Sequence, residues 1–468
     1  MKRVAFKTFG CRLNQAETAQ IAAGFEAAGY EVVPGGQPSD VCVIHTCAIT
    51  GRAEHTCLLF ARALRRKPNP PVVVLAGCAV DIAGDALKER CGADLTAGRD
   101  AKFDIPGMLR ERGQVSDQHP ASGIRHPVSG LLSPATYHLS PVPCPLPPAP
   151  CLLPRFDTIR ALVKVQDGCD FRCAYCIVPL ARGGPRSRPF REVVDEVRRI
   201  AEAGYREIVL TGANLGCYQD GRLRLVDLIA AIERIPAVER IRLSSIESST
   251  TEHAVLDYMA TSAKLCRYLH LPLQTGDDAL LRDMGRRYTS RQYRDLVERA
   301  VERIPLLGLG TDVLVGLPGE TDAAFANTWS IVTDLPFSNL HIFPYSKRPG
   351  TRAAGMAGQV SPATKKERCV RLAALGRDKR ARFAAQFVGR TVSVLVERVT
   401  AHGIGSGWTG ERIEARMQRP GLAANTVVSV LPSRAEDDVL YGWQEPIACV
   451  PRNRTCAQGE TSVPFALD

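Results

Sequence analysis

The chain has 468 residues, 45% of them hydrophobic and 23% charged, which excludes a disordered protein and predicts two to four domains. Its longest apolar stretch, Val72–Val80, falls short of the ~20 residues that span a bilayer, and its charged N-terminus is unlike a signal peptide, so we expect a cytoplasmic protein without membrane contact. The 60 basic and 49 acidic residues give a formal charge of +11, which favours a polyanionic partner such as nucleic acid.

Residues 1–112 alternate between apolar strand-like runs and helical patterns, which is typical of a small parallel α/β sheet. Asn14 is expected to be the N-cap of the first helix, with Glu17 as the acid of a capping box. The predicted elements, in chain order, are Val4–Thr8, Asn14–Ala28, Val41–Thr46, Arg52–Arg66, Val72–Ala76 and Asp81–Arg90.

Residues 113–156 have the composition of an extended linker. Ten of the chain's 32 prolines lie between Val115 and Pro154, where strand and helix periodicity are absent over long stretches.

Residues 157–388 resume the alternation with about six strand–helix units, which predicts an open, partial (β/α)6 parallel barrel. This region ends in a basic helix, Lys365–Arg390, where nine lysines and arginines stand against Glu367 and Asp378.

Residues 389–447 contain short β-rich runs separated by glycine-rich turns such as Gly403–Gly407, and they predict a small antiparallel barrel. Residues 448–468 are interpreted as a tail. The expected strands of the barrel are Val392–Val399, Ile413–Met417, Val427–Leu431 and Val439–Trp443.

Sixteen cysteines in a cytoplasmic protein favour cluster or metal ligation over disulfides. Cys169, Cys173 and Cys176 have Cys-x-x-x-Cys-x-x-Cys spacing directly after an apolar run. Three thiolates are one short of the four that saturate a 4Fe-4S cluster, so one iron keeps an open position for a cofactor. A zinc knot is the alternative, but zinc sites normally close with four ligands in paired spacings, and no suitable fourth ligand lies nearby.

Cys11, Cys47 and Cys78 are far apart in sequence, but each follows the carboxyl end of a predicted strand. Because these ends meet at one edge of a parallel sheet, we expect the three thiols to converge in space. A buried structural role is the alternative for each cysteine taken singly. The others share no such position and are interpreted as core, surface or linker residues: Cys42, Cys57, Cys91, Cys144, Cys151, Cys217, Cys266, Cys369, Cys449 and Cys456.

The spacing of the later triplet, with Tyr175 before its last cysteine, resembles the radical S-adenosylmethionine superfamily. In that superfamily the open iron binds the amino and carboxylate groups of the cofactor, which one electron then cleaves. A chain with a second three-cysteine site suits a reaction that needs both a radical and a sulfur source. Sulfur insertion into an unactivated carbon–hydrogen bond is such a reaction.

From its N-terminus to about Gly442, apart from the linker, the chain resembles the methylthiotransferase family of radical enzymes. The order of an N-terminal cluster domain, a radical domain and an RNA-binding TRAM barrel is the family's. The resemblance also rests on four shorter stretches: Val165–Cys169, Ala181–Gly183 with Ser187–Arg188, Leu210–Gly216 and Gly316–Glu320.

This resemblance implies two 4Fe-4S clusters. Cys11, Cys47 and Cys78 would hold the auxiliary cluster that delivers sulfur, and the catalytic set of Cys169, Cys173 and Cys176 would hold the cluster that cleaves S-adenosylmethionine. Residues near the cofactor would be Tyr175, Thr211, Gly212, Ala213 and Asn214. For the last four, a glycine after a strand lets the backbone approach a ligand closely, and an ordinary strand-to-loop turn is the alternative.

Three branches of the family differ in substrate, and four stretches look most like the threonylcarbamoyladenosine branch: Phe9–Gln15, Arg242–Glu247, Leu269–Gln274 and His341–Thr351. That branch adds a methylthio group to C2 of N6-threonylcarbamoyladenosine at position 37 of tRNA. A radical abstracts the C2 hydrogen, the auxiliary cluster supplies sulfur, and a second S-adenosylmethionine supplies the methyl group. Arg348 and Arg352 are candidates to pair with the substrate carboxylate.

Other substrates within the family are N6-isopentenyladenosine in tRNA and an aspartate of a ribosomal protein. A non-catalytic iron–sulfur protein that binds RNA is a more distant alternative, but an electron carrier gains nothing from an open iron. The expected partners are a tRNA anticodon loop and a reductant such as flavodoxin or ferredoxin, and the chain is expected to be a monomer.

Three features depart from the family pattern. The proline-rich insert is unlike a short connection, Thr275 stands where the family usually has serine, and the tail after Trp443 matches no family segment. None of them involves the six proposed cluster ligands.

Overall fold

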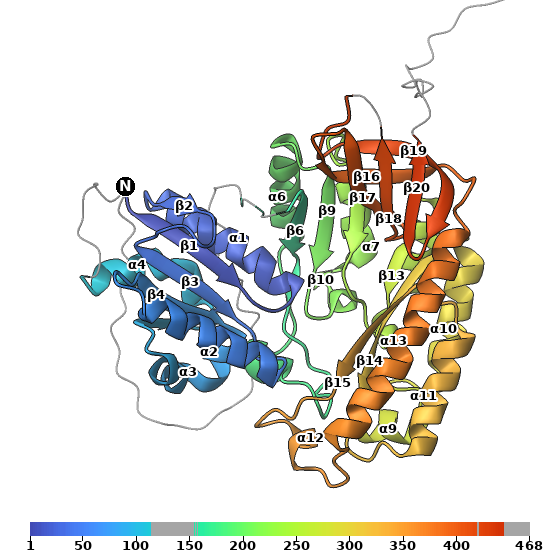
Figure 1. Cartoon of the computed structure of the whole chain (residues 1–468), viewed down its shortest axis with the longest axis horizontal. Coiled ribbons are helices and arrows are strands. Elements are labelled where there is room, and N and C mark those ends of the chain that lie inside the picture. The colour runs from blue at the N-terminus through green and yellow to red at the C-terminus, as the bar shows by residue number, and fades with distance from the viewer. Residues whose placement is uncertain (114–153, 155, 157, 419–420, 444–468) are drawn as a thin grey trace, which may run out of the picture.

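The computed structural model describes residues 1–113, 154, 156, 158–418 and 421–443. It confirms an α/β fold in three parts, with an N-terminal parallel sheet, a central open barrel and a C-terminal closed barrel (Figure 1). All but three residues of the predicted linker, and the whole predicted tail at 448–468, lie outside the described residues. No helix in the described part of the chain is long and apolar enough to cross a membrane.

The N-terminal sheet has five parallel strands in the order β2-β1-β3-β4-β5. Its central strand β3 is buried along its whole length, as expected for a parallel sheet with both faces covered. The elements are β1 (Arg3–Thr8), α1 (Arg12–Ala27), β2 (Glu31–Val33), β3 (Val41–Thr46), α2 (Gly51–Arg65), β4 (Val72–Gly77), α3 (Cys78–Cys91), β5 (Leu95–Ala97) and α4 (Ile105–Glu111).

The predicted capping box of the first helix is wrong. Helix α1 begins at Arg12, and its N-cap is Cys11, which makes no side-chain cap hydrogen bond. Asn14 and Glu17 therefore lie inside the helix, where both are fully buried. Their polar atoms bond to other segments of the chain instead of to the first turn of the helix. The residue types of a capping box are therefore present, but the side chains do not form one.

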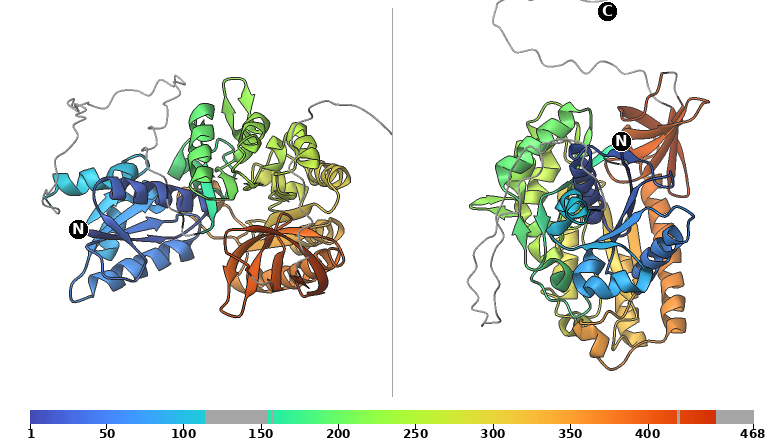
Figure 2. Two further views of the ribbon diagram at one scale, coloured as in Figure 1. Left: turned by 90° about the horizontal axis from the view of Figure 1, so that it is seen from above. Right: turned by 90° about the vertical axis from the view of Figure 1, so that its left-hand side faces the viewer.

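The central barrel has six parallel strands in two sheets, ordered β12-β9-β6 and β13-β14-β15. Isolated bridges between Ile241 and Leu265 and between Ser245 and His270 connect the two sheets. The barrel is open between β6 and β15, and the N-terminal domain lies beside β6 (Figures 1 and 2). The strands are β6 (Arg160–Lys164), β9 (Glu207–Thr211), β12 (Arg240–Leu243), β13 (Tyr268–His270), β14 (Gly308–Val315) and β15 (Asn339–Pro344).

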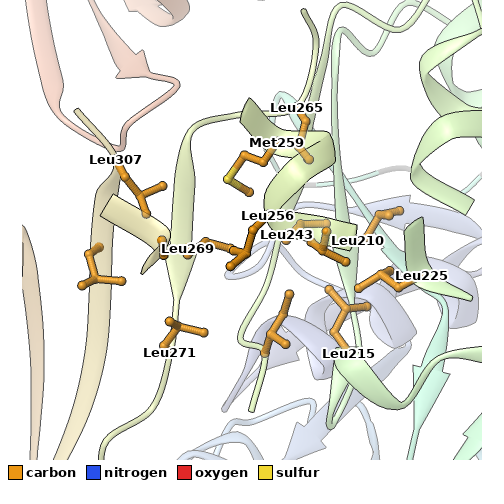
Figure 3. Close-up of a cluster of buried hydrophobic side chains, with 14 of the residues drawn as sticks. Leu210, Leu215, Leu225, Leu243, Leu256, Met259, Leu265, Leu269, Leu271 and Leu307 are labelled. Atoms are coloured by element: carbon orange, nitrogen blue, oxygen red, sulfur yellow. The ribbon is translucent and has the colours of Figure 1, made fainter. Parts of the chain in front are cut away.

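Helices cover the outside of this barrel and enclose a leucine-rich core, part of which is drawn in Figure 3. In β14, Leu309 and Val313 belong to that core, so alternation directs Gly310 and Asp312 to the opposite face, which is the barrel lumen. The helices of this region are α5 (Val178–Arg182), which packs against α3 of the N-terminal domain, and α6 (Phe190–Glu202), α7 (Leu225–Glu233), α8 (His253–Thr261), α9 (Asp278–Asp283), α10 (Ser290–Arg303), α11 (Asp322–Asp334), α12 (Arg352–Gly355) and α13 (Pro362–Ala385).

The C-terminal part is a closed barrel in the order β16-β17-β18-β20-β19, formed by β16 (Val392–Val399), β17 (Ile404–Thr409), β18 (Glu414–Gln418), β19 (Val427–Glu436) and β20 (Val439–Trp443). The pair β18–β20 is parallel and the other pairs are antiparallel, so the all-antiparallel prediction was wrong at one pair.

The prediction of a turn at Gly403–Gly407 was also wrong, because most of this stretch lies in β17. A Cβ at Gly405 would clash with Leu422, and one at Gly407 would clash with the carbonyl of Leu395. The glycines therefore permit close packing inside the small barrel rather than a turn.

Buried ion pairs join the two barrels. Glu207 accepts a hydrogen bond from Arg242 Nε at 2.7 Å and lies 3.1 Å from Arg240 Nε. Arg242 also donates to the carbonyls of Thr409 and Gly410, both at 3.0 Å, in the turn between β17 and β18. This turn therefore lies against the amino ends of the central barrel strands.

Replacing Glu207 with glutamine is expected to lower the free energy of unfolding by about 3 kcal/mol at pH 7, because two buried arginines lose their counter-charge. Burial raises the pKa of Glu207, but Arg242 and Arg240 outweigh it and lower the pKa from 4.5 to about 2. A carboxylate whose pKa falls on folding stabilises the protein above pH 4.5 and loses this contribution between pH 4.5 and 2.

Urea unfolding at pH 7 and at pH 3 measures this effect. Glu239→Gln is the control, because Glu239 makes a half-exposed pair with Arg206. The difference between Glu207→Gln and the natural protein should be largest at pH 7 and smaller at pH 3. Equal unfolding midpoints at pH 7 would contradict the assignment.

Candidate active site

The loop that carries Cys169, Cys173 and Cys176 follows β6 and is held by other segments. Cys169 N donates to the carbonyl of Gly183 at 3.0 Å, and Ala174 N donates to the carbonyl of Met284 at 2.8 Å. Burial, together with the nearby Cys173 and Cys169, raises the pKa of the Cys176 thiol to about 12. The loop thus brings the three thiols together, as the spacing predicted.

The two cysteine triplets do not have the spacing of a single-ion site. Among the described residues, the set of three donor atoms that lie within 4.8 Å of one another is His270, Asp312 and His341. A 4Fe-4S cluster places each thiolate on a different iron, so more widely separated sulfurs fit it better than they fit zinc.

Arg286 is a residue at this site that the sequence analysis missed. Its Nη1 donates to Tyr175 Oη at 3.0 Å and to Cys173 Sγ at 3.2 Å, and its Nη2 donates to Glu247 Oε2 at 2.5 Å. Its buried Nε makes no hydrogen bond within the described part of the chain. No sequence motif identifies Arg286, because the segment after α9 meets the cysteine loop only in the folded chain.

The segment Thr211–Asn214 ends β9 beside the same loop. Gln166 connects the two, since its Nε2 donates to the carbonyl of Gly168 at 2.8 Å and its Oε1 accepts from Asn214 N at 2.9 Å. A Cβ at Gly212 would lie 2.9 Å from Gln166 Oε1 and 3.0 Å from Gln166 Cβ, so a larger residue here would displace Gln166. Asn214 is buried, and its Nδ2 has no partner among the described residues, which leaves a donor free for a ligand.

Cys11, Cys47 and Cys78 converge at the carboxyl edge of the N-terminal sheet, as predicted. Asn14 Oδ1 lies 3.8 Å from Cys11 Sγ and 3.9 Å from Cys78 Sγ. A Cβ at Gly10 would lie 3.1 Å from Cys47 Sγ. Cys11 is the N-cap of α1 and Cys78 is the first residue of α3, so two helix N-termini, which favour negative charge, face this group.

A buried polar network connects the two triplets. Glu17 accepts hydrogen bonds from Lys102 Nζ and Lys164 Nζ, both at 2.8 Å, and from Arg182 Nη1 at 3.0 Å. Arg182 also donates to Asn14 Oδ1 at 2.7 Å and to Asp167 Oδ1 at 2.9 Å. Lys164 and Arg182 belong to the central barrel, so this network fixes the position of one triplet relative to the other.

The two arginines expected to meet a substrate carboxylate have other contacts. Arg348 is buried and forms an ion pair with Glu54 of α2. Arg352 Nη2 donates to the carbonyl of Asp283 at 2.5 Å. Glu54 also pairs with Arg90 at 2.9 Å, and Arg348 Nε has no hydrogen-bond partner among the described residues, so the role of Arg348 stays a prediction.

The barrel and its cysteine loop together define a radical S-adenosylmethionine enzyme. A model described as "Radical SAM superfamily" matches residues 163–329, and one described as "Uncharacterized protein family UPF0004" matches residues 3–98. A 4Fe-4S cluster and S-adenosylmethionine are the cofactors of this class. The fold is similar to that of the radical methyltransferase TsrM from Kitasatospora setae, with a TM-score of 0.54 at 15% identity over 76% of this chain and 75% of TsrM.

Relatives with assigned names narrow the class. The chain is 34% identical over 401 residues to the threonylcarbamoyladenosine tRNA methylthiotransferase MtaB of Bacillus subtilis (strain 168), covering 85% of each chain. It is 33% identical to the protein of that name from Thermotoga maritima, covering 87% of this chain and 89% of the relative. It is also 33% identical to the tRNA-2-methylthio-N(6)-dimethylallyladenosine synthase of Erythrobacter litoralis, covering 86% and 88%. The chain belongs to the methylthiotransferase family of radical S-adenosylmethionine enzymes.

Proposed function

We propose that this enzyme adds a methylthio group to C2 of N6-threonylcarbamoyladenosine at position 37 of tRNA. The observation that carries the proposal is the pair of cysteine triplets joined through Glu17 and Arg182, because a radical and a sulfur source must act on one carbon atom. The names of the relatives from Bacillus subtilis and Thermotoga maritima support this substrate.

In this proposal Cys169, Cys173 and Cys176 hold one 4Fe-4S cluster, and Cys11, Cys47 and Cys78 hold a second. When bound, the first cluster supplies the electron that cleaves S-adenosylmethionine, and the second supplies sulfur.

The chain's own residues position the cofactor in this proposal. Asn214 Nδ2, an unpaired donor just after β9, donates a hydrogen bond that orients the cofactor. Thr211, Gly212 and Ala213 form the backbone beside it. Arg286 fixes Tyr175 next to Cys173 through one guanidinium nitrogen that donates to both side chains.

The domains follow the expected boundaries in this proposal: a cluster domain at 1–112, a linker at 113–156, a radical domain at 157–388, a TRAM-like barrel at 389–447 and a tail at 448–468. The basic helix α13 and the barrel contact a cytoplasmic tRNA, whose target base leaves the anticodon loop to reach the clusters. A flavodoxin or ferredoxin supplies electrons, and the enzyme acts as a monomer.

N6-isopentenyladenosine is the second candidate substrate, because the Erythrobacter litoralis relative is named for an adenosine of that kind. Two anticodon hairpins, one with each modified adenosine, compete for the enzyme in one reaction. We expect the threonylcarbamoyl hairpin to be methylthiolated at least about tenfold faster than the isopentenyl hairpin. A rate ratio of this size corresponds to the free energy of one charge contact with the substrate carboxylate. Preferential reaction of the isopentenyl hairpin would overturn the proposed substrate.

A further inference from the structure

The lumen of the central barrel contains polar groups that no contact satisfies. Tyr268 is 1% exposed, and its hydroxyl makes no hydrogen bond within the described residues. On the neighbouring strand, a Cβ at Gly310 would clash with this hydroxyl and would lie 2.8 Å from His270 Nδ1. Because Gly310 has no side chain, the Tyr268 hydroxyl and the His270 imidazole can both lie against its backbone.

Two arginines bring uncompensated charge to this hydroxyl. The guanidinium of Arg412 lies 5.4 Å from the centre of the Tyr268 ring, and the charges that act on Arg12 include those of Arg412 and Tyr268. Across the described residues, neither guanidinium has a hydrogen bond or an ion pair, whereas nearby Arg242 is paired with Glu207.

The acidic group of the lumen, Asp312, forms no ion pair with Arg12 or Arg412 within the described residues and faces two imidazoles instead. Asp312 Oδ1 lies 3.0 Å from His270 Nε2 and 3.3 Å from His341 Nδ1. Arg380 donates to Asn339 Oδ1, so the Asn339 amide nitrogen faces His341 Nε2 at 2.9 Å and the ring proton lies on Nδ1. His270 thus hydrogen-bonds to Asp312, and the protonated Nδ1 of His341 faces the same oxygen, an arrangement that gives a cation no free imidazole lone pair on that side.

We propose that this lumen is the specificity pocket for the threonylcarbamoyl group, in which Arg12 and Arg412 bind the carboxylate and the Tyr268 hydroxyl donates a further hydrogen bond. The inference rests on the proposed function and names the residues that read the substrate. Arg12 directly follows Cys11, so one helix terminus places an anion-binding group beside the proposed sulfur site. An isopentenyl group carries no charge and would leave both guanidiniums without a counter-charge, so the pocket disfavours it.

The Arg412→Gln variant tests the charge contact. Full-length protein is titrated with two anticodon hairpins, one with N6-threonylcarbamoyladenosine and one in which the threonine carboxylate is converted to an amide. The natural protein should bind the carboxylate hairpin at least about tenfold more tightly, and Arg412→Gln should bind both with similar affinity. The control Arg303→Gln removes a positive charge from the exposed face of α10, where Arg303 pairs with Asp257, and should keep the preference.

Tyr268→Phe is the second variant, because it removes only an unpaired hydroxyl. Its thermal midpoint should equal or exceed that of the natural protein, while its affinity for the carboxylate hairpin should fall about 5- to 20-fold and its affinity for the amide hairpin should not change. Equal binding of the two hairpins by the natural protein, or a full preference in both variants, would overturn the pocket. Methylthiolation of only the isopentenyl hairpin by the natural protein would instead overturn the proposed function.

Discussion

Replacing Cys173 with alanine is expected to abolish both the cleavage of S-adenosylmethionine and the formation of methylthio product, each by more than about 1000-fold. Cys173 is the buried, central thiol of the three-cysteine loop, and Arg286 fixes it next to Tyr175. Two remaining thiols leave two irons of a 4Fe-4S cluster without a protein ligand. Chromatography of 5'-deoxyadenosine measures the cleavage, and iron analysis reports the loss of one cluster.

Cys369→Ala is the matched control for this variant, since Cys369 is a partly buried cysteine of α13 outside both triplets. It should form 5'-deoxyadenosine at the rate of the natural protein. Undiminished cleavage by Cys173→Ala would show that this loop does not hold the cluster.

The second large effect is expected from Cys78→Ala, which should keep the cleavage of S-adenosylmethionine but lose the methylthio product. Cys78 lies in the other triplet, where its sulfur and that of Cys11 contact the same Asn14 oxygen. Its removal takes away a ligand of the proposed sulfur source and leaves the radical site intact. The expected readout is 5'-deoxyadenosine without methylthio nucleoside, and about half the iron content.

Cys91→Ala controls for a change in helix α3, because Cys91 is buried at the far end of the same helix and its thiol donates to the carbonyl of Leu87. It should form the full amount of product. Methylthio nucleoside formed by Cys78→Ala at the natural rate would exclude Cys78 as a ligand of the sulfur source.

The positions of the cysteines relative to the strands could be predicted from the sequence, because short apolar runs mark strands without any tertiary information. The alternation of apolar runs located the strands that precede Cys11, Cys47 and Cys78, and parallel topology then required these thiols to converge. The close spacing of Cys169, Cys173 and Cys176 needed no tertiary information. The relatives confirm the family, while the roles of these cysteines stay predictions.

The contacts between domains could not be predicted, because they depend on partners far away in sequence. Glu17 fits a capping box as well as a buried ion pair, and only the position of Lys164 on β6 decides between them. Arg286 and Arg412 carry no motif, since their neighbours lie on other segments of the chain. At Gly405 the composition resembles a turn, although the glycine serves close packing in β17.

The most direct test of the account is mass spectrometry of tRNA nucleosides. The enzyme is reconstituted anaerobically with iron and sulfide and incubated with S-adenosylmethionine, a reductant and tRNA that carries N6-threonylcarbamoyladenosine, beside the Cys173→Ala variant. We expect 2-methylthio-N6-threonylcarbamoyladenosine from the natural protein and none from the variant. Cluster formation without any methylthio nucleoside, or the same product from both proteins, would contradict it.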